Sequence, residues 1–222
     1  MNGVLDGKVA VVTGAELPVA RSIGLALGGA GAQVIEVDAA WSTREAAVSA
    51  FQDVVDGYGN VDIVVHAAMP AIAFEPIDFV DVDDARFEAI WEGTLRSTIF
   101  LLQAAFPRLR GRGGRVLFVT PTVSMFGAAG LTAYTVAVEA QRVLLKATAR
   151  QWGPDGVTLN ALATAPEHVP IGVASTTVSL APPALGGPGD PEHDLGPIAV
   201  FLASEAAHFV TGATIRDRKS VV

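Results

Sequence analysis

Short apolar runs alternate with longer segments of helical spacing, and this alternation constrains the fold more than any other feature of the chain. The apolar runs are typical of buried strands and lie at residues 9–13, 32–37, 61–67, 114–120 and 156–163. The helical segments repeat apolar residues at three- and four-residue steps and lie at residues 18–30, 42–58, 84–109 and 133–152. Strands that are apolar on both faces and separated by helices form covered parallel sheets. The sequence therefore predicts an α/β fold: a doubly wound, mostly parallel sheet with helices on both faces.

Composition limits the number of domains and the kinds of partner. Half of the 222 residues are hydrophobic and 17% are charged, which suits one packed domain over residues 1–222, with 181–191 as an irregular loop. The net charge of −8 disfavours nucleic acid and anionic membranes as partners. The lack of cysteine excludes thiolate chemistry, and no apolar run reaches the ~20 residues of a membrane-spanning helix. We expect a cytoplasmic protein.

The stretch "TGAELPVA", Thr13 to Ala20, follows the first predicted strand and opens the first predicted helix. A strand–turn–helix of this kind binds the diphosphate of a dinucleotide when glycines let the backbone approach the ligand. Here Gly14 is followed by Glu16, Leu17 and Pro18. Proline has no N–H to donate and is a favourable first residue of a helix. The stretch thus predicts a helix start without a nucleotide site.

Five longer stretches carry a family resemblance: "LDGKVAVVTGA", "YGNVDIVVHAA", "GGRVLFVT", "AYTVAVEAQRVLLKATARQWGPDGVTLNALA" and "FLASEAAHFVTGATI". From Gly7 to about Ile215 the chain resembles the short-chain dehydrogenase/reductase family, most of all the 3-oxoacyl-carrier-protein reductases. The resemblance implies a Rossmann-type domain and NAD(P)-dependent oxidoreduction. The stretch from Asp38 to His66 is shorter than in the family by about one helix and one strand. We therefore expect one helix–strand unit after the second strand to be missing.

The resemblance also assigns cofactor positions. The family pattern T-G-x-x-x-G-x-G falls on Thr13, Gly14, Pro18 and Ala20, so only Gly14 and a tolerated alanine remain of three glycines. Asp38 stands where relatives bind the adenosine ribose and favour NAD over NADP, although we slightly prefer to interpret it as a solvated aspartate at a strand end. Gly14 and Asp38 are the candidate cofactor residues. We expect no bound dinucleotide, and NAD if any.

The family's chemistry uses a tyrosine, a lysine four residues later, a serine and an asparagine. Tyr134 matches the tyrosine and is the candidate catalytic residue. Val138, Pro121 and Thr94 occupy the lysine, serine and asparagine positions. A tyrosine without a neighbouring cation keeps a pKa of ~10 and is a poor acid–base catalyst at neutral pH.

Other landmarks have changed as well. The hydroxyl-bearing residues Thr120, Thr122 and Ser124 flank the serine position and offer a local replacement. His66 to Met69 replace the family's N-N-A-G, and Thr164–Ala165 replace its P-G. A histidine at a strand end is more often structural than catalytic, and we interpret His66 in this way.

Three functions are consistent with this pattern. The first is a catalytically impaired subunit that binds no cofactor and acts through assembly. The second is an active NAD-dependent oxidoreductase of a carbonyl or hydroxyacyl substrate with a locally shifted site. The third is a non-redox enzyme, as the related halohydrin dehalogenases are. Those enzymes keep a serine and place arginine at the lysine position, whereas this chain has Pro121 and Val138. We favour the first function.

Assembly is predicted through the two long helices at 84–109 and 133–152. In relatives these helices pack against their counterparts in a second subunit. Apolar residues surround much of the first helix, and small or apolar residues line the second: Ile99, Phe100, Ala104, Val136, Ala140, Val143 and Ala147. A helix that is apolar on more than one side must be buried on more than one side. We expect a dimer or tetramer of this chain, or assembly with a catalytically complete sibling.

Overall fold

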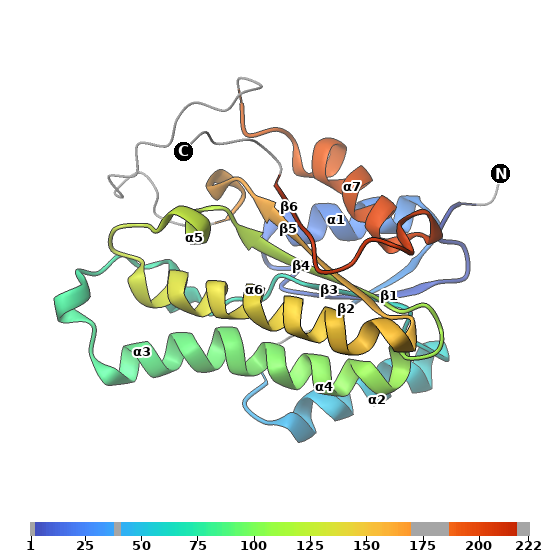
Figure 1. Ribbon diagram of the computed structural model, residues 1–222, viewed down its shortest axis with the longest axis horizontal. Helices are drawn as coiled ribbons and strands as arrows, with labels where there is room; N and C mark the ends of the chain where they lie inside the picture. The colour runs from blue at the N-terminus through green and yellow to red at the C-terminus, as the bar shows by residue number, and fades with distance from the viewer. Residues whose placement is uncertain (1–2, 38–40, 170–186, 217–222) are drawn as a thin grey trace.

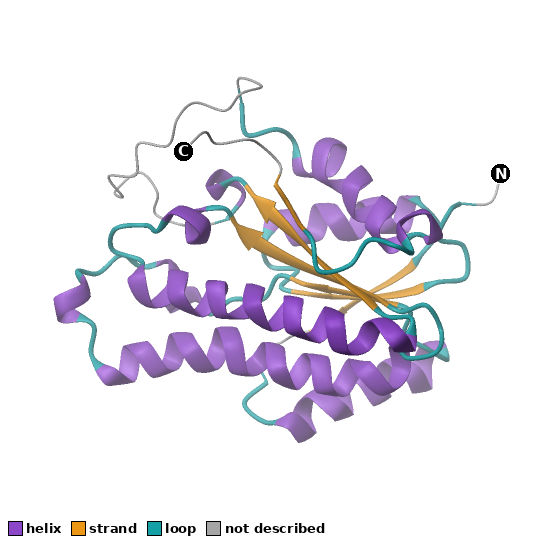
Figure 2. Ribbon diagram, in the orientation of Figure 1, coloured by secondary structure: helices purple, strands orange, loops and turns teal. Residues whose placement is uncertain are grey.

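The computed structural model describes residues 3–37, 41–169 and 187–216, and these residues form one three-layered α/β domain (Figures 1 and 2). Six parallel strands in the described residues form one sheet with the order β2-β1-β3-β4-β5-β6. Their bounds are β1 Val9–Thr13, β2 Gln33–Val37, β3 Ile63–His66, β4 Arg115–Pro121, β5 Thr158–Thr164 and β6 Thr214–Arg216. Every residue of β1, β3, β4 and β5 is buried, as the continuous apolar runs predict. The α/β fold expected from the sequence is confirmed.

Helices cover both faces of the sheet. Their bounds are α1 Pro18–Gly29, α2 Arg44–Tyr58, α3 Asp84–Trp91, α4 Ser97–Leu109, α5 Val123–Phe126, α6 Thr132–Trp152 and α7 Gly196–Ala203. Short 3₁₀ turns lie at Ala71–Phe74 (η1), Phe79–Asp81 (η2), Gly153–Asp155 (η4), Pro166–His168 (η5) and Glu205–Ala207 (η8), and a π-turn lies at Pro191–Leu195 (η7). One hydrophobic core lies under α1 and α7 and extends to the first half of α6, and a second lies under α2, α4 and the second half of α6. The domain is therefore held by two apolar layers, one on each face of the sheet.

The sheet ends at β2. The described residues between β2 and β3 contain one helix, α2, which packs against α4 and carries the chain across to β3. This arrangement confirms the expected loss of a helix–strand unit after the second strand. It also leaves β2 as an edge strand with partly exposed residues.

The helix predicted at 84–109 is continuous but contains a π-turn, η3 Glu92–Arg96, between α3 and α4. Gly93 lies in this turn, where an added Cβ would come 2.9 Å from the Pro70 ring. Two residues of the apolar repeats at 42–58 and 84–109 are exposed: Tyr58 at the end of α2, and Phe87, whose ring stacks on that of Trp91 with centroids 6.0 Å apart. The periodicity located the helices correctly but overstated burial near their ends.

Several sequence expectations lie wholly or partly outside the described residues. These are Asp38 and most of the segment 170–191, including the greater part of the loop at 181–191. No helix in the described part of the chain is long and apolar enough to span a membrane.

Candidate functional site

Gly14 follows β1 and has a φ of 78°, a conformation that favours glycine. A Cβ at this position would lie 2.5 Å from the Ala68 nitrogen and 2.6 Å from the Ala67 carbonyl carbon. The loop after β1 therefore touches the backbone of the loop after β3. This contact requires glycine whether or not a nucleotide binds.

Leu17 and Pro18 form the start of α1. The Leu17 side chain is only 4% exposed and belongs to the core under α1. Its amide donates to the Gly14 carbonyl at 2.9 Å, while the Ala20 and Arg21 amides donate to the Leu17 carbonyl at 3.0 and 3.1 Å. Pro18 has no amide hydrogen. Most donors at this helix start are thus used within the chain or are missing, and the exposed carboxylate of Glu16 adjoins them. These residues do not fit a diphosphate as the family's glycines do.

Tyr134 lies in the first turn of α6 and is 1% exposed. Its hydroxyl donates to the Met69 sulfur at 2.6 Å, and its ring lies 5.7 Å from that of Phe74. Burial raises the pKa of Tyr134 well above its usual value. Val138, one turn later, is also buried, so it adds an apolar contact where relatives place a cation.

The serine position, the asparagine position and one candidate replacement hydroxyl lie on three separate elements. Pro121 ends β4, Thr94 lies in the π-turn, and Ser124 lies in α5. The Ser124 hydroxyl donates to the Pro121 carbonyl at 3.1 Å, which uses it in a local turn. Thr120 and Thr122, the other candidate replacements, are buried. Whether any of these hydroxyls replaces the missing serine stays a prediction.

His66 ends β3 within a buried hydrogen-bond network. Its Nδ1 lies 2.7 Å from the Thr13 hydroxyl, and its Nε2 lies 2.8 Å from the Thr98 hydroxyl. Thr98 donates its own proton to the Thr94 carbonyl at 2.7 Å, so its oxygen accepts from His66 Nε2 and from Gln141 Nε2, the latter at 2.6 Å. His66 therefore carries its proton on Nε2 and accepts from Thr13. Burial lowers the pKa of His66 to about 4, which keeps the ring neutral.

Gln141 is a site residue that the sequence reading missed. Its side-chain amide donates to the Thr94 carbonyl at 2.9 Å, in the π-turn, as well as to Thr98. The Ser97 hydroxyl lies 3.2 Å from the same carbonyl. A glutamine among the inward-facing positions of the helix 133–152 was the available signal. This side chain ties α6 to α4 beside the position where relatives have their catalytic asparagine.

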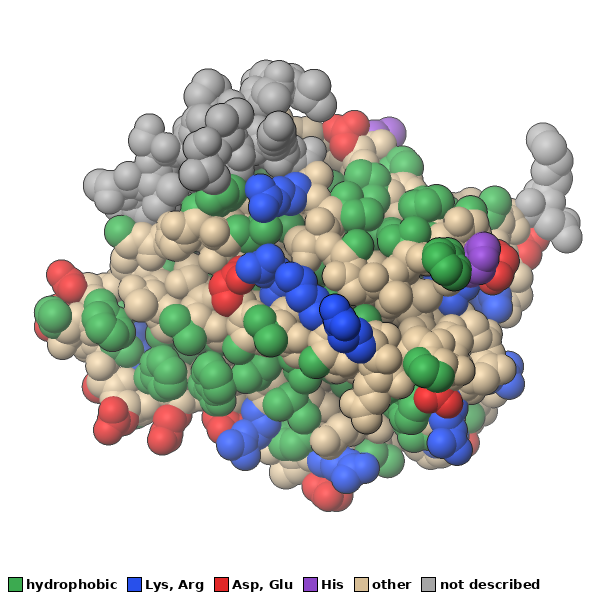
Figure 3. Space-filling model, viewed as in Figure 1, with side chains coloured by type: hydrophobic (Ala, Val, Ile, Leu, Met, Phe, Trp, Pro, Cys, Tyr) green, Lys and Arg blue, Asp and Glu red, His purple; other side chains and the backbone are tan. Residues whose placement is uncertain are grey.

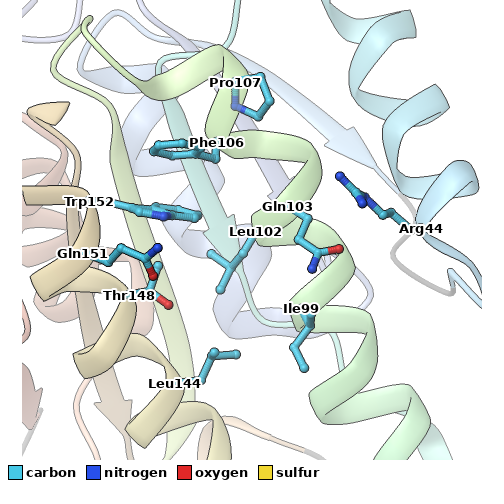
Figure 4. Close-up of a pocket in the computed structure, with 10 residues that line it drawn as sticks. All are labelled: Arg44, Ile99, Leu102, Gln103, Phe106, Pro107, Leu144, Thr148, Gln151 and Trp152. Carbon is cyan, nitrogen blue, oxygen red and sulfur yellow. The ribbon is translucent and has the colours of Figure 1, made fainter.

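A groove of about 460 Å³ lies between α4 and α6, on the side of these helices away from the sheet (Figure 4). Phe106 and Trp152 stack in it with ring centroids 4.5 Å apart, and Leu144 and Ile99 lie further along it. Arg44 of α2 supplies a cation at its rim. The described residues contain no cluster of histidine and carboxylate side chains that could hold a metal.

Comparison with known proteins agrees with this architecture. A family model described as Enoyl-(Acyl carrier protein) reductase matches residues 8–216, nearly the whole chain. The chain belongs to the short-chain dehydrogenase/reductase family. The resemblance drawn from the sequence motifs is confirmed.

Among its relatives, the 3-oxoacyl-[acyl-carrier-protein] reductase of Vibrio cholerae is 29% identical over 95% of this chain and 96% of its own. The 12alpha-hydroxysteroid dehydrogenase of a Clostridium species is 24% identical over 96% of each chain. The solved enoyl-[acyl-carrier-protein] reductase (NADH) of Aquifex aeolicus superposes with a TM-score of 0.81 at 21% identity, over 97% of both chains. This last likeness shows the fold.

Proposed function

We propose that this family member is a catalytically impaired subunit that binds neither NAD nor NADP with useful affinity and acts through assembly. The single observation that carries the proposal is the start of α1, where Pro18 replaces a glycine of the phosphate loop and the Leu17 side chain before it is buried in the core. A diphosphate placed there would meet a proline ring, a carboxylate at Glu16 and few free amides.

The state of Tyr134 supports the same proposal. In the family this phenol exchanges a proton with substrate, which requires access and a nearby cation. Here the hydroxyl is buried and donates to Met69, and Val138 supplies no charge. Because burial raises the Tyr134 pKa, the phenol holds its proton firmly at neutral pH. Both changes oppose acid–base chemistry.

The outer face of α4 and α6 supports assembly. Val136 and Val143 on α6 are 48% and 65% exposed, and the groove between α4 and α6 is largely apolar. Figure 3 shows apolar and basic side chains over this face of the molecule. Exposed apolar surface of this kind marks contact sites in soluble proteins. We infer a dimer or tetramer built on these helices, with a second copy or with an active sibling.

Part of the predicted contact surface needs correction. Ala104 is buried in the chain's own core, so it is not available to a second subunit. Ile99, Phe100 and Ala140 are half-buried, and Ala147 is exposed. The contact surface is therefore centred on α6 and the groove, more than on the whole circumference of α4.

Two measurements on the purified chain test the proposal. A turnover assay with NADH or NADPH and a 3-oxoacyl thioester should give no rate above background. Light scattering at micromolar concentration should give the mass of a dimer or tetramer, alone or with an active sibling. A monomer under both conditions, or turnover that is lost on Tyr134→Phe, would overturn the proposal.

The second candidate function is an active NAD-dependent oxidoreductase with a shifted site. The observation that favours it is the group of hydroxyls around Pro121, at Thr120, Thr122 and Ser124. Under this alternative, turnover would exist and would fall on Tyr134→Phe and on substitution of one of these hydroxyls. A non-redox activity finds no such support, because Pro121 and Val138 lack the serine and arginine of the dehalogenases.

A further inference from the structure

Among the residues that the structure describes, strand β2 pairs with β1 alone and has no neighbour on its other side. Its neighbour β1 pairs with it in a parallel register that places Val9 opposite Gln33 and Val11 opposite Ile35. The Gln33 amide donates to the Lys8 carbonyl at 2.8 Å, which fixes the direction of the remaining backbone groups. In a parallel ladder alternate residues face the same neighbour, so Gln33, Ile35 and Val37 face β1. The N–H and C=O groups of Val34 and Glu36 therefore face the open side.

A groove runs beside this open edge. It has a volume of about 340 Å³ and lies between β2 and α2. Its lining is mostly apolar with two carboxylates: Ile35, Glu36, Val37, Ala50, Asp53, Val54 and Tyr58. The shortened connection after β2 leaves both the backbone edge and the groove uncovered by any described residue. The edge thus offers backbone hydrogen bonds and apolar contact side by side.

The charges of the edge select among possible occupants. Glu36 and Asp53 are both exposed, and neither forms an ion pair among the described residues. A second copy adding its own β2 would bring the two Glu36 carboxylates to the same edge, and charged side chains on edge strands oppose such pairing. A strand that carries lysine or arginine on the face away from α2 would instead offset the charge of Glu36, whose side chain alternates with those of Ile35 and Val37.

We propose that the open edge of β2 binds an extended segment of a partner protein as an added strand, with alternating cationic and apolar side chains. Val34 and Glu36 each donate and accept one backbone hydrogen bond, which gives affinity. Apolar side chains enter the groove against Ile35 and Val54, and cationic side chains, which alternate with them, lie on the opposite face of the sheet beside Glu36, which gives specificity. This site is separate from the α4–α6 surface and does not depend on the proposed function.

A synthetic peptide of about six residues with alternating lysine and valine serves as the probe, since strands of this length are usual. Hydrogen exchange of the intact chain is followed residue by residue by NMR. We expect the peptide to slow exchange of the Val34 and Glu36 amides at least tenfold, while the Ile35 and Val37 amides, already bonded to β1, change little. Unchanged exchange at Val34 and Glu36 in saturating peptide would overturn the proposal. So would slowing that grows with protein concentration in the absence of peptide, because the occupant would then be a second copy.

Charge-reversal variants distinguish specific binding at this edge from non-specific electrostatic attraction. Glu36→Lys should weaken binding of the lysine–valine peptide at least tenfold and allow binding of a glutamate–valine peptide. The matched control is Glu16→Lys, which makes the same change of net charge in an exposed loop away from the groove. Equal loss of binding in both variants would show non-specific attraction and overturn the proposal.

Discussion

The two sides of helix α6 differ in the burial of their apolar side chains. On the inner side, Tyr134 and Val138 are buried and pack in the apolar core. On the outer side, Val136 and Val143 of the same helix face solvent beside an apolar groove. Filling an internal site with packed side chains stabilises the fold. Exposed apolar side chains do not stabilise an isolated subunit, and we infer from them that this side of α6 contacts another subunit.

The loop between β1 and α1, where relatives bind phosphate, is packed into the same core as the inner side of α6. Leu17 occupies the core, and Gly14 is required by a backbone contact with the loop after β3. Each feature that remains of the family motif thus has a structural reason in this chain. The exposed apolar side chains on the outer face of α6, by contrast, have no stabilising role within one subunit.

The largest expected effect is on assembly. Val143→Asp places a charge on the exposed face of α6, where burial against a second subunit would desolvate it. We expect the dimer or tetramer to become a monomer in light scattering. Val4→Asp, at an exposed apolar residue outside these helices, is the control and should leave the mass unchanged. An intact oligomer for Val143→Asp would show that α6 is not the contact helix.

The next largest effect is expected at the phosphate loop. Leu17→Ala should lower the free energy of unfolding by about 3 kcal/mol, because it removes a buried side chain and leaves a cavity. Leu25→Ala on the same helix is the matched control, since Leu25 is 58% exposed, and its effect should be within about 0.5 kcal/mol. Urea unfolding measures both. Equal effects would mean that Leu17 is not a core residue.

His66 makes stability depend on pH. Its pKa is about 4 in the folded chain and about 6.5 when unfolded, so the unfolded state binds the proton more readily. Its contribution is complete above pH 6.5 and is lost as the pH falls towards 4, by about 3 kcal/mol in total. Urea unfolding at several pH values should show this slope, and His66→Asn should reduce it. An unchanged slope in the variant would assign the effect to other groups.

A small effect is expected at Tyr134. Tyr134→Phe removes a hydrogen bond to Met69 but keeps the ring against Phe74, so the free energy of unfolding should change by less than about 1.5 kcal/mol. Thermal unfolding monitored by circular dichroism checks this. A larger loss would mean that the phenol is a main anchor of α6, and the inner side of the helix would then depend on a polar contact.

The fold was accessible from the sequence because periodicity is a local property. The runs at 9–13 and 114–120 and the helix at 133–152 match β1, β4 and α6 closely. From the sequence, the site could be predicted only as a set of positions at which the family's residues are replaced. Where Leu17 packs, and that Tyr134 donates to Met69, 65 residues away, depends on contacts between distant segments. The pattern of apolar and polar residues along the sequence does not indicate which distant residues are in contact.

Gln141 illustrates the same limit. Its spacing in α6 shows that a polar side chain faces inward, but its acceptors, Thr94 and Thr98, lie on the preceding long helix. The Thr94 carbonyl lies in a π-turn that helical periodicity does not distinguish from regular α-helix. The prediction of a changed site was therefore possible, whereas the internal network that occupies it required the structure.

Calorimetric titration of the purified chain with NADH and with NADPH tests the central claim most directly. The account predicts no saturable heat for either dinucleotide. The exposed residues Glu16 and Pro18 and the buried Leu17 stand where relatives have their phosphate-binding loop. The variant Pro18→Gly, titrated in parallel, reports whether the proline at the family's glycine position alone blocks the site. A dissociation constant in the low micromolar range for the unaltered chain, with either dinucleotide, would contradict the account.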